Sequence, residues 1–279
     1  MILSGKKASE ELFTTLQTNI SSLPKPPTLS AIQVGDNPAS STYIRMKKKK
    51  IESLGMKFVH TQLPENCTEE QLENSIYDLN HNNEITGILL QLPLPEHLQK
   101  KERALLNLIH PQKDVDCLTS KNIGAFFTGE SQLLPATPLG VLRLLEYYEI
   151  KMACSITIIG RSNLVGKPLA IALTNRNATV TLCHSCTENL YEITRRSDIV
   201  ITAVGNPNYF TKEYFHNRQV VIDIGISKTT TGELAGDVEF LTVRDHVHAI
   251  TPVPGGVGPM TIYGLVENLV LLASESMSS

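Results

Sequence analysis

Short apolar runs separated by amphipathic segments divide the chain into two series of alternating strands and helices. Three runs in the first series have the length and apolar character of buried strands: 28–34, 56–63 and 86–92. Five more strands are expected in the second series: 155–160, 179–184, 198–205, 219–226 and 248–251. A capping box at Thr68 and Gln71 predicts the start of one of the helices between the strands. Strands that alternate with helices are typical of parallel sheets covered by helices. The pattern therefore predicts an α/β fold with two α/β domains and an active-site cleft between them.

The strand pattern restarts after a helix start at Thr137-Pro138, and this restart sets the expected domain boundary. Residues 1–138 are predicted to form one domain, and residues 139–259 a second domain of the Rossmann type. The last helix, in 260–279, is expected to pack back on the first domain. With 279 residues and 41% hydrophobic content, the chain is long enough to bury a core in each domain.

Asn37-Pro38 predicts the start of a helix and Gly55 its end, with a run of lysines between them. At about 100° per residue, Lys47 falls in the middle of the apolar stripe of this helix, whereas the next two lysines rotate outward. Tyr43 lies one turn earlier on the same side. Burial of Lys47 would lower its pKa and allow proton transfer at neutral pH. The alternative is a lysine whose stem covers apolar surface while its ammonium reaches water.

Polar residues that follow the third predicted strand are candidate ligand groups. Gln91 lies at the end of that strand, and ligands of parallel sheets bind at the carboxyl ends of the strands. Asp114 and Asp116 follow in a loop, where a carboxylate can accept hydrogen bonds from an amide-like edge with two N–H donors. Capping of the helix near Asn122 is the alternative role for these aspartates.

The apolar run that ends at Gly160 turns into a helix through a second glycine, Gly166, as the phosphate-binding turns of dinucleotide sites do. The spacing of the two glycines differs from both G-x-G-x-x-G and the P-loop. No acidic residue occurs between Gly160 and Glu188, so the site is expected to accept a ribose phosphate and to prefer NADP to NAD. Arg161 and Ser185 are the expected phosphate contacts. A tight turn that binds no ligand is the alternative.

Two other motifs have less specific chemistry. The loop after the last predicted strand carries glycines, including Gly255 and Gly256, which would let its backbone approach a ligand or would simply form a rigid turn. Cys183 and Cys186 form a C-x-x-C motif, but no second pair completes a metal site. Packing of Cys183 at a strand end is therefore favoured, and no metal is expected.

The overall charge and the cysteines narrow the choice of partners and compartment. A net charge of -3 favours small-molecule ligands over nucleic acid or an acidic membrane surface. The chain has five cysteines, an odd number, and neither a signal-type N-terminus nor an apolar run long enough to span a bilayer is evident. We therefore expect a cytoplasmic protein with no nucleic-acid or membrane partner.

Taken together, these segments resemble the bifunctional methylenetetrahydrofolate dehydrogenase/methenyltetrahydrofolate cyclohydrolase family. The resemblance covers nearly the whole chain and rests on several motifs in one order: 34–43 with Lys47, 90–94, 113–116, 160–168, 236–238 and 250–261. It implies NADP-dependent oxidation of 5,10-methylenetetrahydrofolate to the methenyl form, followed by hydrolysis to 10-formyltetrahydrofolate. It also implies tetrahydrofolate derivatives as ligands, and a homodimer.

The same resemblance implies a role for each candidate residue. Lys47 matches the family's proton-transfer residue, with Gln91 in support, and Tyr43 matches the aromatic that orients the folate. Asp116 matches the pterin-binding carboxylate, and the glycine loop at 255–256 borders both ligands. The cofactor residues that the family pattern implies lie in the second domain: Gly160, Arg161, Ser162, Ser185 and Ile226.

Two residues depart from the family pattern. Cys117 stands where glycine usually follows Asp-Val-Asp, so a side chain would occupy a position that suits a positive φ. Ser227 replaces an asparagine on the nicotinamide side. Two alternative functions are an NADP-dependent dehydrogenase of another small substrate and a non-catalytic nucleotide-binding regulator. The inward position expected for Lys47, together with Gln91 and Asp116, argues against the regulator.

Overall fold

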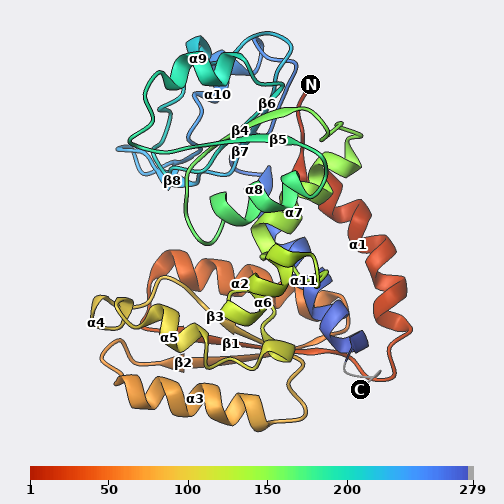
Figure 1. The fold of residues 1–279 in the computed structure, drawn as a ribbon. Coiled ribbons are helices and arrows are strands. Elements are labelled where there is room, and N and C mark those ends of the chain that lie inside the picture. The colour runs from red at the N-terminus through yellow and green to blue at the C-terminus, as the bar shows by residue number, and fades with distance from the viewer. Residues whose placement is uncertain (276–279) are drawn as a thin grey trace. The chain divides into compact units, whose positions relative to one another are not determined.

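The computed structural model describes residues 1–275, which fall into two compact units. The three-stranded unit consists of Phe13–Ala136 and the chain from Leu265 onward. The five-stranded unit consists of Met1–Leu12 and Thr137–Gly264. Helices α1 (Gly5–Ser21) and α11 (Val257–Glu275) each run from one unit into the other (Figure 1). Each unit is an α/β structure with its own parallel sheet, as the alternating pattern predicts.

The first twelve residues belong to the five-stranded unit, whereas the sequence pattern assigned them to the first domain. Ile2 forms a parallel bridge with Ile250, and the Leu3 amide donates to the Ile250 carbonyl at 2.8 Å. These bonds place the N-terminus beside the edge strand β10 (Ala249–Ile250). Contacts between residues so far apart in the chain leave no periodic signal in the sequence.

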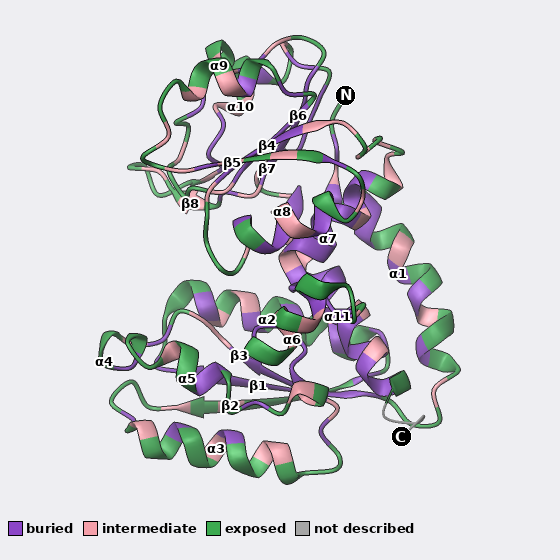
Figure 2. Ribbon diagram, in the orientation of Figure 1, coloured by how far each residue is buried: buried purple, intermediate pink, exposed green. Residues whose placement is uncertain are grey.

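The three-stranded sheet has the order β2-β1-β3, and all its pairs are parallel. Its strands are β1 (Thr28–Val34), β2 (Lys57–Leu63) and β3 (Gly87–Leu90). Figure 2 shows β1 buried, whereas the edge strand β2 is largely exposed. The chain passes from β1 to β2 on one side and returns to β3 on the other. The strand order therefore reverses between β1 and β3, the point where α/β sheets bind ligands.

Helices of the three-stranded unit begin where the sequence predicts. The Asn37 side chain caps α2 (Pro38–Ser53), and Thr68 and Gln71 form the capping box of α3 (Glu69–His81). Shorter helical segments follow β3: α4 (Glu96–Gln99), α5 (Glu102–Leu106), a 3₁₀ turn at Pro111–Lys113 and α6 (Ser120–Thr128). Apolar side chains from α3, α4, α5, β1 and β3 contribute to one core cluster.

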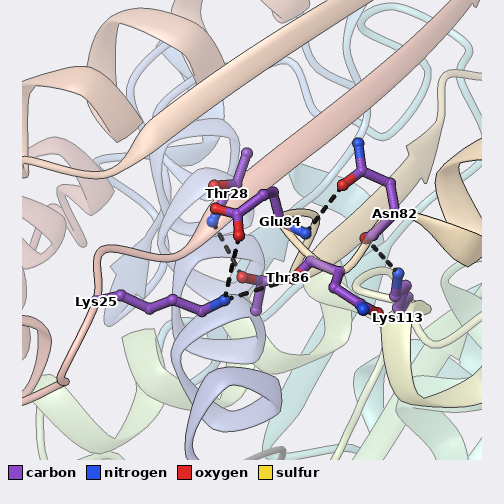
Figure 3. A network of polar contacts seen from close by, with 7 residues as sticks. Lys25, Thr28, Asn82, Glu84, Thr86 and Lys113 are labelled. Atoms are coloured by element: carbon purple, nitrogen blue, oxygen red, sulfur yellow. Dashed lines mark hydrogen bonds and ion pairs between the residues drawn. The ribbon is translucent and has the colours of Figure 1, made fainter.

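A polar network joins the segments that precede β1, β3 and the Asp114 loop (Figure 3). Lys25 pairs with Glu84 at 4.0 Å, and the Thr28 amide donates to the Thr86 hydroxyl at 3.1 Å. The Lys113 ammonium donates to the Asn82 carbonyl at 2.8 Å, as well as to two carbonyls at the end of α3. These bonds anchor the start of the loop that carries the two candidate aspartates alongside β3.

The five-stranded sheet has the order β10-β7-β6-β4-β5, again entirely parallel. In addition to β10, its strands are β4 (Ser155–Ile159), β5 (Thr179–Cys183), β6 (Ile199–Thr202) and β7 (Val220–Asp223). The chain leaves β4 for β5 on one side and returns to β6 on the other, so this sheet has its reversal point between β4 and β6. All five strands lie where the sequence predicts, with shorter ends.

The remaining helices and a small hairpin complete the five-stranded unit. The helical segments are α7 (Ala136–Tyr147), α8 (Gly166–Thr174), α9 (Leu190–Arg195), a 3₁₀ turn at Lys212–Tyr214 and α10 (Phe240–Val243). The hairpin pairs β8 (Ser227–Lys228) with β9 (Leu234–Ala235) in antiparallel fashion. Its strands have two residues each, too few to produce the alternation by which strands are predicted.

Helix α11 bears on the expectation that no apolar run is long enough to span a bilayer. Within residues 1–275 it is long and apolar enough to cross a membrane by length and composition. However, 67% of its 18-residue window is buried inside the protein. The Asn268 side chain, 1% exposed, donates to the Val115 and Leu134 carbonyls at 2.9 and 2.7 Å. An apolar helix that packs in this way has the character of a core helix of a globular protein.

Candidate functional site

Helix α2 buries one lysine of its lysine run and exposes the next two. Lys47 is 8% exposed and lies on the buried stripe of α2, with Ile44 and Ile51 on either side of it in the chain. Lys48 and Lys49 are exposed, and the Lys48 ammonium lies 3.8 Å from the Glu52 carboxylate. The burial expected for Lys47 from the helical periodicity is thus confirmed.

The Lys47 ammonium is held by a side chain from the end of β3. Its Nζ donates to Gln91 Oε1 at 3.1 Å, and Gln91 Nε2 donates to the Leu92 carbonyl at 2.7 Å. The second bond fixes the orientation of the amide, so that its oxygen faces the lysine. The backbone amide of Gln91 donates to the Ile32 carbonyl on β1, which sets the height of Gln91 at the strand end. The pair lies at the reversal point of the three-stranded sheet.

The structure separates the roles of the two aspartates that the sequence left open. Asp114 is buried and accepts hydrogen bonds from the Leu118 amide at 3.0 Å and the Thr119 amide at 2.8 Å. It also accepts from Asn122 Nδ2 at 2.9 Å, so it organises the start of α6. Asp116 is partly exposed, and its carboxylate has no hydrogen-bond partner within residues 1–275. Only Asp116 therefore remains available to a ligand.

Burial and nearby charge shift the proton affinities in this group. Burial lowers the pKa of Lys47 below its ordinary value, while the negative charge of Asp116 acts in the opposite direction. Burial raises the pKa of Asp116; Lys47 opposes this rise and Asp114 adds to it. Burial also raises the pKa of Tyr43, which is partly exposed on α2. A lysine with a lowered pKa can exchange protons nearer to neutral pH than a surface lysine can.

Sequence reasoning missed a buried glutamine at the same end of the sheet. Gln33, at 2% exposure, is paired with Gln62 of β2 in the sheet register and donates through Nε2 to the Ser41 hydroxyl at 2.8 Å. Ser41 in turn donates to Asp36 at 2.8 Å, so Gln33 anchors the first turn of α2. The signal was present in the sequence, because a glutamine inside the apolar run of β1 requires a polar partner.

In the five-stranded unit, backbone segments approach each other so closely at the glycine turn that there is no room for a side chain on either glycine. Gly160 has φ of 129°, and a Cβ there would lie 2.3 Å from the Ala203 carbonyl oxygen. A Cβ on Gly166 would lie 1.8 Å from the Gly160 carbonyl oxygen. The Ser162 hydroxyl accepts from the Val165 amide at 3.1 Å and braces the turn. Helix α8 then begins at Gly166, and the Lys167 amide donates to the Ser162 carbonyl at 3.1 Å.

The other cofactor candidates lie at the carboxyl ends of neighbouring strands. Ile159 and Cys183 are paired in the β4–β5 register, and Arg161 and Ser185 each follow two residues later. Both side chains are exposed, so the guanidinium and the hydroxyl are open to an anion. Ile226, 41% exposed, follows β7 at the same edge of the sheet.

The loop with Gly255 and Gly256 also belongs to the five-stranded unit. Gly255 has φ of 101°, and its carbonyl accepts from the Lys6 amide at 3.0 Å. A Cβ on Gly256 would lie 2.4 Å from the Pro252 carbonyl oxygen. These glycines are thus required by the path of the backbone itself, which is the structural alternative that the sequence left open.

Cys117 adopts the left-handed conformation anticipated for its position. Its φ is 54°, it is fully buried, and its Sγ donates to the Leu133 carbonyl at 3.4 Å. In the C-x-x-C motif, Cys183 is buried and Cys186 is exposed. Among residues 1–275, no group of three or more His, Cys, Asp and Glu side chains could hold a metal ion.

Comparisons with known proteins identify relatives over the full chain. The family model described as the tetrahydrofolate dehydrogenase/cyclohydrolase catalytic domain matches residues 3–116, and its NAD(P)-binding counterpart matches residues 135–277. The bifunctional protein FolD of Lachnoclostridium phytofermentans is 45% identical over 99% of this chain and 98% of its own length. That of Bacillus subtilis is 42% identical, with 99% of each chain covered.

Solved structures show the same similarity in three dimensions. The bifunctional methylenetetrahydrofolate dehydrogenase/cyclohydrolase of Campylobacter jejuni superposes with a TM-score of 0.95 at 42% identity, covering 99% of each chain. The enzyme of Trypanosoma brucei, solved with NADP cofactor and an inhibitor, has a TM-score of 0.93 at 33% identity and covers 100% of this chain and 99% of its own.

We predict that thiol-specific labelling of the native protein modifies Cys186 first. Cys186 is exposed, whereas burial raises the pKa of Cys117 and Cys183 and reduces the reactive thiolate. Peptide mass spectrometry after brief treatment with iodoacetamide measures the order, and unfolded protein, in which all five thiols should react, is the control. Labelling of Cys117 as early as Cys186 would contradict the buried position of Cys117.

Proposed function

Because this chain belongs to the tetrahydrofolate dehydrogenase/cyclohydrolase family, we propose that it carries out both reactions of that family. It oxidises 5,10-methylenetetrahydrofolate to 5,10-methenyltetrahydrofolate with NADP and then hydrolyses the product to 10-formyltetrahydrofolate. The observation that supports this proposal most directly is the buried Lys47 ammonium, 3.1 Å from Gln91 and in electrostatic contact with Asp116.

For hydride transfer, the chain's task is to position the substrate and the cofactor. The carbon between two nitrogens of the folate gives up hydride readily because the cation that forms is delocalised, and NADP supplies the acceptor. Asp116 accepts hydrogen bonds from the amide-like edge of the pterin, a role supported by its lack of a protein partner within the described chain. Tyr43 packs against the folate ring from the same helix as Lys47.

For hydrolysis, Lys47 acts as the general base for the attacking water. Water adds to the methenyl carbon, and the neutral amine of Lys47 accepts the proton that the water loses as the new C–O bond forms. The bond between that carbon and N5 of the folate then breaks as the C=O bond forms, and the remaining hydroxyl proton passes to N5, which leaves the formyl group on N10. The lowered pKa of Lys47 increases the fraction of the neutral form relative to that of a surface lysine. Gln91 holds the amine in place through its oriented amide oxygen.

The cofactor is held by the glycine turn of the five-stranded unit. The absence of Cβ atoms at Gly160 and Gly166 lets the backbone of the turn approach a pyrophosphate closely, as glycine turns before helices do in dinucleotide sites. Ser162 supports the turn. Arg161 and Ser185 bind the ribose phosphate that distinguishes NADP from NAD, and Ile226 lies on the nicotinamide side. The loop of Gly255 and Gly256 borders the two ligands.

These residues assign one ligand to each unit of the chain. The three-stranded unit is the folate-binding catalytic part, and the five-stranded unit is the NADP-binding part. We further propose a homodimer, supported by the exposed edge strand β2 with Val59 at 41% exposure, because open sheet edges tend to pair. The five free cysteines suit a cytoplasmic location.

The activity is tested by mixing the protein with NADP and methylenetetrahydrofolate and following reduced-nicotinamide absorbance. Wild-type protein should form NADPH with little residual methenyl product after acidification, and Lys47→Met should lose hydrolysis by about a hundredfold or more while it retains part of the hydride transfer. Lys49→Met, which removes an exposed lysine from the same helix, is the control. If Lys47→Met retains both activities equally, Lys47 does not have this role.

The pH dependence of hydrolysis should change when the negative charge of Asp116 is removed. Asp116 raises the pKa of Lys47, so Asp116→Asn should lower that pKa further and move the rising limb of the kcat profile to lower pH. The profile is measured at saturating methenyltetrahydrofolate after subtraction of the uncatalysed rate. Asp78→Asn on the exposed side of α3 should leave it in place. A limb that stays or moves to higher pH would contradict the assignment.

Cofactor choice should depend on Arg161. Replacement by alanine removes a charge-assisted hydrogen bond to the ribose phosphate, so the KM for NADP should rise by about tenfold or more while that for NAD changes little. Steady-state kinetics with each cofactor measure the two constants. Arg196→Ala, just after α9, removes another exposed cation of the same unit and is the matched control. An equal change for NADP and NAD would exclude a phosphate contact by Arg161.

A further inference from the structure

Two buried aspartates, Asp223 and Asp237, lie at the carboxyl edge of the five-stranded sheet. Asp223 ends β7 and Asp237 follows the hairpin strand β9, and their exposures are 3% and 0%. Neither is among the residues assigned above to substrate or cofactor. Burial of two neighbouring carboxylates is costly unless hydrogen bonds satisfy them, so their partners indicate what they do.

Asp237 binds the loop that follows β6. Its Oδ2 accepts from the Val204 amide at 2.7 Å, and its Oδ1 accepts from the Asn206 amide at 2.8 Å. The residue between them is also fixed, because the Ser227 hydroxyl donates to the Gly205 carbonyl at 3.0 Å. Three successive residues of an irregular loop are therefore held by side chains from outside it.

Asp223 joins the ends of the strands to this arrangement. Its Oδ1 accepts from the Thr202 hydroxyl at 3.1 Å and from the Gly225 and Asp237 amides, each at 3.0 Å. Its Oδ2 accepts from the Val238 amide at 2.8 Å. The Asp223 carboxylate thus bonds to three segments: the end of β6, the turn that leads into Ile226 and the segment that carries Asp237.

Glycines make room for both carboxylates. A Cβ on Gly225 would lie 2.2 Å from Asp237 Cγ, and one on Gly236 would lie 2.0 Å from Asp223 Oδ2. The loop held by Asp237 starts at Ala203, whose carbonyl oxygen is the atom that a Cβ on Gly160 would strike at 2.3 Å. The aspartate pair is therefore connected, through direct backbone contact, to the turn proposed to hold the cofactor phosphates.

We propose that Asp223 and Asp237 are positioning residues for NADP: they shape the loop at 203–206 and the turn at 224–226 on either side of the nicotinamide half without touching the cofactor. This inference rests on the proposed placement of NADP at this edge. Carboxylates suit the role because both of their oxygens accept, whereas an asparagine would direct an N–H toward one of the amides. Burial raises the pKa of both groups, and the backbone amides oppose that rise.

The test variant is Asp237→Asn, studied in the full chain after wild-type protein has been shown to reduce NADP. We expect the KM for NADP to rise by about tenfold, equivalent to about 1.4 kcal/mol. Hydrolysis of added methenyltetrahydrofolate needs no NADP and should stay within about twofold of wild type, since Lys47 and Gln91 lie in the other unit. Asp198→Asn is the matched control: its carboxylate accepts the Ser155 amide at 3.0 Å at the opposite edge of the same sheet.

An unchanged KM for NADP in folded Asp237→Asn would overturn the inference, as would an equal loss of NADP reduction and hydrolysis. If Asp237→Asn does not fold, Thr202→Val provides the test, because it removes a single donor to Asp223 without a change of shape. We then expect the KM for NADP to rise by about two- to threefold with hydrolysis unchanged, and no rise would overturn the inference. A wild-type protein that reduces no NADP would instead contradict the proposed function.

Discussion

The buried ammonium of Lys47 constrains how the three-stranded unit can be arranged. Removing a charge from water costs several kcal/mol, and the cost is offset only by nearby polar groups with good geometry. Gln91 contributes one hydrogen bond and Asp116 contributes opposite charge. The donors at the start of α6 need an acceptor, and Asp114 accepts three hydrogen bonds from them. The Asp116 carboxylate is therefore not used for this purpose. The spacing Asp-Val-Asp thus separates a structural carboxylate from one that remains available.

The main constraint on the five-stranded unit is the close approach of backbone segments at its glycine turn. Gly160 is in contact with Ala203, and Gly166 with Gly160, at distances that exclude any side chain. The reversal of strand order between β4 and β6 brings these segments together, because the connections that leave the two strands run in opposite directions. Because these glycines carry no side chains, the backbone of the turn can approach a phosphate-rich ligand closely.

Much of this arrangement could be predicted from the sequence because it depends on local periodicity. The strands, the helix start at Asn37, the capping box at Thr68 and the inward direction of Lys47 all follow from patterns within one or two turns of chain. The pairing of Ile2 with Ile250, the division of roles between Asp114 and Asp116, and the bonds of Asp223 and Asp237 could not be predicted. Each depends on contacts that only the folded topology brings together.

Cys117 shows how a departure from a family pattern can be accommodated. A non-glycine residue at φ of 54° costs about 1 kcal/mol, which argues for glycine at this position. The thiol recovers part of that cost because it is fully buried and donates to the Leu133 carbonyl. Its side chain therefore points into the protein, where it supports the loop between Asp116 and α6. The Cys117 side chain thus packs beneath the candidate carboxylate of Asp116, which stays partly exposed.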